Sequence, residues 1–151
     1  DKRRIGSSLD TPPAVGNSKY LRIWVDLTGV DFRKANLGLI AQNGTVYTTD
    51  NKDNSETPFY YLADGDKTWK KLYHGGDGCF GNAQGSSVRD YKGWLAFPIE
   101  DFAASTSSPA GPGSSVVMKE VFLFFDFTEL SMQGSTFYID ELGMVPEYWV
   151  F

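Results

Sequence analysis

The sequence predicts an all-β protein, a β-sandwich of two antiparallel sheets. Three observations predict it. Aliphatic residues alternate with polar and aromatic residues in several short runs, turn-forming residues separate these runs at regular intervals, and no stretch of useful length shows the 3.6-residue period of a helix. The composition, with 16 glycines, 7 prolines and 15% aromatic residues, is typical of this class, and 151 residues suffice for one domain with its own core.

The N-terminal segment 1–18 mixes basic residues with Ser, Thr, Asn and two prolines. We interpret it as an arm that holds a short edge strand at 4–9. The first strand of the sandwich is expected at 20–27, where two sets of residues alternate: Leu21, Ile23, Val25 and Leu27 against Tyr20, Arg22, Trp24 and Asp26. One face of this strand therefore belongs in a core, and the other combines indole, guanidinium and carboxylate groups.

The next two strands are expected at 37–41 and 45–49. Asn43 and Gly44 between them are typical of a tight hairpin, so the two strands should be antiparallel neighbours. Further strands are expected at 58–62 and 69–73, separated by the turn residues at 64–66. The glycine-rich stretch 74–87 that follows is interpreted as a binding loop or a plain connection.

The second half of the chain predicts three more strands. In 93–99 aliphatic and aromatic residues alternate, and Pro98 near the end indicates an edge position or a bulge. A short helical turn is expected at 100–104. The stretch 116–128 is the longest apolar strand and is expected to be central, whereas 136–145 closes the sandwich before Pro146 and leaves 147–151 as a C-terminal stub. The sandwich itself is thus expected at 19–146.

Charge and cysteine content narrow the function classes. The chain has 14 basic and 19 acidic residues, a formal charge of −5, which opposes binding to nucleic acid or to an anionic membrane. No apolar run is long enough to span a membrane, and the N-terminus does not resemble a signal peptide. Cys79 is the only cysteine, so no internal disulfide is expected, and this usage is compatible with an extracellular location in an anaerobic setting.

Several aromatic residues are candidates for contact with a sugar. A sugar ring presents an apolar C–H face and a rim of hydroxyl groups, so it is recognised by an aromatic ring flanked by hydrogen-bonding side chains. Trp24, with Arg22 and Asp26 as neighbours, and Trp94 lie on the faces opposite the aliphatic sets of their strands. The alternative is that a loop or the arm simply covers one of the two indoles.

A second candidate group follows the turn at 64–66. Trp69, Tyr73 and His74 lie beside a pair of lysines and the glycine-rich stretch, and Tyr60 is the outward candidate of its own strand. The alternative for this group is a loop anchor. The predicted carbohydrate-binding residues are therefore Arg22, Trp24, Asp26, Tyr60, Trp69, Tyr73, His74 and Trp94.

An enzyme is the less favoured interpretation. His74 is the only histidine, and no nucleophile elbow lies near it, so a Ser-His-Asp triad is not indicated. Cys79 as a thiol nucleophile, or a metal site of His74, Asp77 and Cys79, would rest on a glycine-rich loop whose spacing fits no zinc pattern. No catalytic residues are predicted.

Three stretches of the second half carry a resemblance to a known family. They are residues 91–102 (YKGWLAFPIEDF), 121–125 (VFLFF) and 137–145 (FYIDELGMV). In this order they resemble the C-terminal half of the jelly-roll carbohydrate-binding modules attached to microbial glycoside hydrolases and cellulosomal enzymes. The resemblance covers roughly residues 19–145. Its motifs are structural signatures and are poorly specific for the ligand.

The resemblance implies a jelly-roll β-sandwich and a non-catalytic module. Such a module would be secreted and would hold a linked catalytic domain against plant cell-wall polysaccharide, with neutral β-glucan or hemicellulose as the expected ligand class. It also implies a fold-supporting role for Asp140 and Glu141. Modules of this kind often bind a structural calcium ion near the N-terminus, where Asp1 and Asp10 are the acids present. The alternatives are a structural or adhesion domain of a cell-surface protein without glycan affinity, and a small polysaccharide lyase or hydrolase.

Overall fold

The computed structural model describes residues 2–8, 13–26, 31–32, 34–49, 58–73, 88–89, 91–105, 107, 110–126 and 138–147. Within that set, segments 2–8, 31–32, 34–36, 72–73, 88–89 and 123–126 and Pro58 are described through their backbone. The strands are β1 (Lys2–Ser8), β2 (Tyr20–Asp26), β3 (Asp31–Phe32), β4 (Lys34–Ala41), β5 (Val46–Thr48), β6 (Pro58–Ala63), β7 (Lys70–Tyr73), β8 (Val88–Arg89), β9 (Lys92–Pro98), β10 (Met118–Asp126) and β11 (Tyr138–Val145). A single 3₁₀ turn, η3 (Ile99–Asp101), follows β9.

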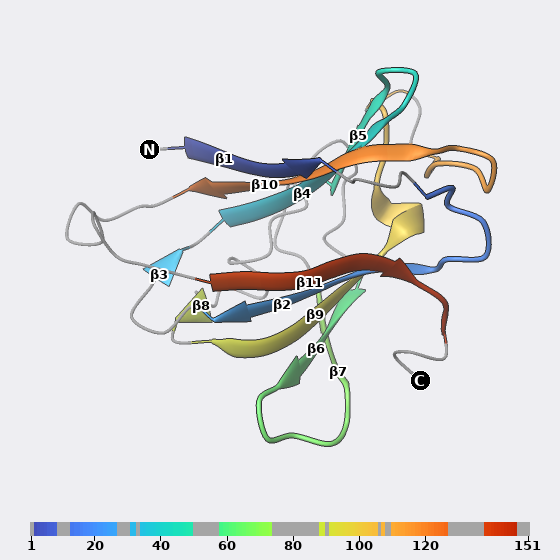
Figure 1. The fold of residues 1–151 in the computed structure, drawn as a ribbon. Helices are drawn as coiled ribbons and strands as arrows, with labels where there is room; N and C mark the ends of the chain where they lie inside the picture. The colour runs from blue at the N-terminus through green and yellow to red at the C-terminus, as the bar shows by residue number, and fades with distance from the viewer. Residues whose placement is uncertain are drawn as a thin grey trace.

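The strands form two antiparallel sheets that lie one above the other (Figure 1). One sheet has the order β1-β10-β4-β5, and the other has the order β11-β2-β9-β6-β7. A small pair, β3 with β8, stands apart from both sheets. The prediction of an all-β sandwich with two antiparallel sheets is confirmed, and the jelly-roll connection remains a prediction.

The core lies between the two sheets and includes inward-facing apolar residues of β2, β4, β6, β9 and β10. In β2, Leu21, Ile23 and Val25 are buried, as the alternation in the sequence predicts. The rings of Phe59 on β6 and Phe97 on β9 stack in this core with centroids 5.2 Å apart. Burial of this apolar surface is the main stabilising contribution to the fold.

The hairpin predicted at Asn43 and Gly44 is confirmed. Strands β4 and β5 pair antiparallel, with Leu39 opposite Tyr47. Gly44 has φ 90°, a conformation that strains any residue with a Cβ atom, and the backbone N–H of Thr45 donates to Asn43 Oδ1 at 3.0 Å. The turn residues therefore fix the register of this pair.

The edge position expected from Pro98 is wrong, because β9 lies inside its sheet between β2 and β6. Pro98 is tolerated there because it is the last residue of the strand. Pairing with β6 ends at Ala96, opposite Tyr60, so the missing N–H of Pro98 interrupts no ladder on that side. The helical turn expected at 100–104 occurs as η3, directly after Pro98.

Strand β10 is central in its sheet, as predicted, because it pairs with β4 on one side and with β1 on the other. Strand β1 extends over Lys2–Ser8, and each of its residues has a register partner in β10. At the edge of the other sheet, β11 pairs with β2, and its register shifts between Asp140 and Gly143. Glu141 in this bulge has φ 48°. In the part of the chain described, no helix has the length and hydrophobicity needed to cross a membrane.

Candidate functional site

The side of the five-stranded sheet that points away from the core is rich in aromatic residues; it is called the outer face below. Strand register places Trp24 of β2 directly opposite Trp94 of β9, and Trp94 in turn lies opposite Leu62 of β6. Asp140 of β11 lies opposite Trp24 on the other side. The outer face comprises Tyr20, Arg22, Trp24 and Asp26 of β2, Lys92, Trp94 and Ala96 of β9, Tyr60 and Leu62 of β6, Lys71 of β7, and Tyr138, Asp140 and Val145 of β11, with Trp69 packed on it.

The two indoles that face each other on this surface are half-buried, and each contacts a cation. The guanidinium carbon of Arg22 lies 4.7 Å from the ring centroid of Trp94, and Nζ of Lys92 lies 5.9 Å from that of Trp24. Both distances are in the range of a cation–π interaction. Lys92 Nζ also lies 3.8 Å from Asp64 Oδ2, so the cation beside Trp24 is held from two sides. Arg22 and Lys92 thereby bring N–H donors over the rings of Trp94 and Trp24.

A second aromatic group lies farther along the same face. Tyr20, Ala96 and Val145 are buried there, and Tyr60 and Trp69 pack against them. The rings of Tyr20 and Tyr60 meet edge to face with centroids 5.7 Å apart. Trp69 thus belongs to the same surface as Trp24 and Trp94, although the sequence interpretation placed it in a separate group.

The remaining residues of the predicted site are described in part or not at all. Tyr73 ends β7 opposite Pro58 in the register, and its side chain is outside the description. His74 lies outside the described residues, as does Cys79. Asp26 is half-buried on the outer face, opposite Lys92 of β9 and Tyr138 of β11.

Sequence reasoning missed Tyr138 as a member of this surface, and it placed Tyr20 on the surface without naming it as a site residue. The side chain of Tyr138 is 63% exposed at the sheet edge. Alternation within 138–145 could have assigned Tyr138 to the face opposite Ile139, but only the pairing of β11 with β2 brings it beside Asp26. Tyr20 begins the same phase as Trp24, yet it is buried by partners that are distant in sequence.

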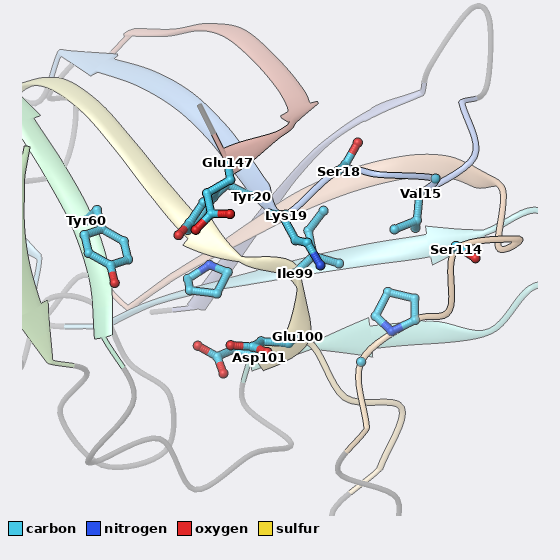
Figure 2. Close-up of a pocket in the computed structure, with 14 residues that line it drawn as sticks. Val15, Ser18, Lys19, Tyr20, Tyr60, Ile99, Glu100, Asp101, Ser114 and Glu147 are labelled. Carbon is cyan, nitrogen blue, oxygen red and sulfur yellow. The ribbon is translucent and has the colours of Figure 1, made fainter. Parts of the chain in front are cut away.

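A half-open cavity of about 570 Å³ adjoins the outer face where β2 begins and β9 ends (Figure 2). Tyr20 and Tyr60 form part of its wall, so the cavity and the aromatic surface share two residues. The other lining residues come from four short segments: Val15, Gly16, Ser18 and Lys19; Pro98, Ile99, Glu100 and Asp101; Gly111, Pro112 and Ser114; and Glu147. No pattern in the sequence indicated that these segments meet.

Burial raises the pKa of Tyr20 to about 12, and the neighbouring Tyr60, Glu147 and Glu100 add to the effect in that order. The phenol of Tyr20 therefore keeps its proton under physiological conditions. The carboxylates that surround it make the local potential negative.

Among the described residues, no group of three or more His, Cys, Asp or Glu side chains lies close enough to hold a metal ion. Asp1 and Asp10, the acids named for a calcium ion, lie outside the described residues. Asp140 instead supports the bulge of β11, where its Oδ1 accepts a hydrogen bond from the backbone N–H of Glu141 at 2.8 Å.

The chain matches no protein-family model, and comparisons with curated proteins and with solved structures find no similar protein.

Proposed function

We propose that this domain is a non-catalytic carbohydrate-binding module that binds a neutral plant cell-wall polysaccharide, a β-glucan or a hemicellulose, on the outer face of its five-stranded sheet. One observation carries the proposal: Trp24 and Trp94 lie opposite each other on neighbouring strands, and Tyr60 and Trp69 continue the aromatic surface on the same face. A surface of this kind on a β-sheet suits an extended chain of sugar rings.

The polar residues between the rings fit the hydroxyl groups of such a ligand. Arg22 and Lys92 supply N–H donors next to the indoles, and Asp26 supplies carboxylate acceptors in the adjacent row. Neighbouring strands lie about 4.8 Å apart, so the aromatic positions on β2, β9 and β6 are spaced over a length of about 10 Å. This span accommodates about two consecutive sugar units.

The benefit of binding would be a higher local concentration of a linked enzyme at its substrate. Weak stacking and hydrogen bonding by the module make the encounter of a tethered catalytic domain with the polysaccharide effectively intramolecular. This function requires an extracellular location and a catalytic domain in the same parent chain, and it requires no reaction by the module itself.

A second candidate is a structural or adhesion domain without glycan affinity. The observation that favours it is the position of Arg22 and Lys92, because a cation already lies against each indole. A face whose indole rings already make cation–π contacts with the protein's own side chains can be stable in water without any ligand. The two candidates differ in whether soluble polysaccharides bind.

Affinity electrophoresis in gels that contain mixed-linkage β-glucan, xyloglucan, xylan or glucomannan separates the two candidates. We expect at least one polysaccharide to retard the protein. Trp24→Ala and Trp94→Ala should each weaken that binding about tenfold, equivalent to about 1.4 kcal/mol, because each removes one stacking surface. The control is Val46→Ala, which truncates an exposed apolar side chain on the other sheet.

Thermal melts must show that the tryptophan variants remain folded. Retardation by no polysaccharide of the panel would reject the module in favour of the adhesion domain. Equal retardation of the wild type and both tryptophan variants would reject the outer face as the binding surface. A reducing-sugar assay on the same mixtures tests the remaining alternative, because only a lyase or hydrolase would release new chain ends.

A further inference from the structure

The cavity at the end of the outer face has walls that backbone hydrogen bonds hold in place. The N–H of Ile99 donates to the carbonyl of Lys19 at 2.9 Å, which joins the end of β9 to the segment before β2. The N–H of Gly16 donates to the carbonyl of Ser114 at 2.8 Å, which joins that segment to the loop before β10. The cavity is therefore a fixed feature of the fold, as a site ready for a ligand requires.

A close approach of two loops completes the wall. A Cβ atom added to Gly111 would lie 2.8 Å from Cα of Glu100 and 2.9 Å from the carbonyl oxygen of Ile99, so only glycine allows this contact. The contact sets the position of Glu100 at the cavity, next to the buried Asp101. The volume of about 570 Å³ is within the range of small-molecule sites and is open on one side.

The cavity is continuous with the aromatic surface. Tyr20 and Tyr60 line the cavity and also belong to the cluster on which Trp69 packs. A glycan lying over Trp94 and Tyr60 thus reaches the cavity at one end of its path. At the opposite end of β2, Tyr138 of the edge strand is exposed.

The polar groups of the cavity favour an uncharged, hydroxyl-rich ligand over an anionic one. Three carboxylates, those of Glu100, Asp101 and Glu147, line it together with one ammonium group, that of Lys19. Carboxylates accept strong hydrogen bonds from hydroxyl groups but repel another carboxylate. The phenol of Tyr20 in the same wall keeps its proton, so it adds no further negative charge to the cavity.

We propose that this cavity binds the terminal unit of a neutral glycan chain whose following units lie on the outer face, and that it discriminates against an acid group on that terminal unit. The inference rests on the proposed function and deepens it, because it assigns chain-end recognition to a module that could otherwise bind anywhere along a polysaccharide. Glu100 and Glu147 are the accessible acceptors of the site, since both side chains are exposed to solvent at the cavity.

The first test is stoichiometry, measured by isothermal titration with the polysaccharide that retards the protein most, in two fractions of different chain length. Chain-end binding gives one protein molecule per glycan chain at both lengths. Internal binding gives a number that rises in proportion to length, and that result would overturn the inference while leaving the proposed function intact.

The second test uses the hexasaccharide of the same polysaccharide and the double variant Glu100→Gln/Glu147→Gln. Loss of both charges should weaken binding of the hexasaccharide at least tenfold. Two charged probes are compared with it: the hexasaccharide oxidised to an aldonate at its reducing end, and the same chain with a uronate at its other end. One of these two probes should bind the wild-type protein at least tenfold more weakly than the unmodified hexasaccharide does. The double variant should show a smaller difference in affinity between that probe and the unmodified hexasaccharide.

The matched control is Glu141→Gln, which neutralises an exposed carboxylate on β11 that does not line the cavity. It should leave affinity and charge discrimination unchanged. If the double variant behaves like this control, or if both charged probes bind as the unmodified hexasaccharide does, the inference is wrong. The proposed function is judged separately, by the effect of Trp24→Ala on binding. If no polysaccharide retards the wild type, both proposals fail together.

Discussion

Gly93 in β9 lies at a position that leaves no room for a side chain. It has φ 145°, and a Cβ atom there would lie 2.3 Å from the carbonyl oxygen of Leu62 on the neighbouring strand β6. We expect Gly93→Ala to lower the free energy of unfolding by about 3 kcal/mol, because both the strained φ and the clash with backbone must be relieved by moving a central strand.

The matched control for this prediction is Gly143→Ala in β11. No atom lies within 4 Å of a Cβ built there, and its φ is not positive, so the change should be below about 1 kcal/mol. Urea unfolding followed by tryptophan fluorescence measures both values. Equal stabilities of the two alanine variants would show that β9 tolerates the side chain and that its approach to β6 is looser than described.

At the scale of the element, β1 protects one edge of the four-stranded sheet. Its seven residues pair with β10 from Asp126 to Glu120, so β10 is a central strand only while β1 is present. Removal of residues 1–9 would expose a row of unpaired N–H and C=O groups on a long strand. We expect a loss of about 3 kcal/mol, or roughly 6–12 °C in Tm, together with self-association in sedimentation velocity.

Ile5→Pro tests the same pairing without shortening the chain, because it removes the N–H of the residue opposite Leu123. It should lower Tm in the same direction as the truncation. A truncated protein that stays monomeric with the wild-type Tm would show that β1 contributes nothing to the sheet, and that residues 1–18 act only as an arm.

The local sequence pattern was sufficient to predict most strands and turns, but it did not predict which strands pair with one another. The alternation in 20–27 predicts β2 and both of its faces, and Asn43 with Gly44 predicts the hairpin, since these signals act within a few residues. The edge position predicted from Pro98 was wrong because a proline indicates where a backbone N–H is missing. It does not indicate whether the partner strand has already ended at that point. Position in the sheet depends on pairing between distant strands.

In the candidate site, too, some features follow from local sequence pattern and others only from the pairing of distant strands. Outward placement of Trp24 and Trp94 follows from period-two alternation in each strand, but their alignment follows from the register of β2 with β9. The same register puts Lys92 and Arg22 beside the rings, which alternation alone does not indicate. The cavity depends on the meeting of segments 15–19, 98–101 and 111–114, joined by backbone hydrogen bonds that carry no side-chain signal.

At the scale of the whole molecule, the buried phenol of Tyr20 and the partly buried phenol of Tyr91 make the free energy of unfolding depend on pH in the alkaline range. Burial raises the pKa of Tyr20 to about 12, and burial likewise raises that of Tyr91, whose O–H donates to the carbonyl of Trp94 at 2.7 Å. Both phenols keep their protons in the folded state after the unfolded chain has lost them near pH 10. Their stabilisation is thus fully present below pH 10 and is lost as pH rises from 10 toward the folded pKa.

We therefore expect the free energy of unfolding to fall above pH 10 by up to about 1.4 kcal/mol per pH unit for each phenol. Tyr91→Phe should cost about 1 kcal/mol at pH 7, where the hydrogen bond to Trp94 is lost, yet its stability should fall less steeply above pH 10. Tyr138→Phe is the control, because Tyr138 is exposed and its curve should parallel that of wild type. Urea unfolding from pH 7 to 12 measures all three curves, and parallel curves for Tyr91→Phe and wild type would contradict a Tyr91 that keeps its proton in the folded state.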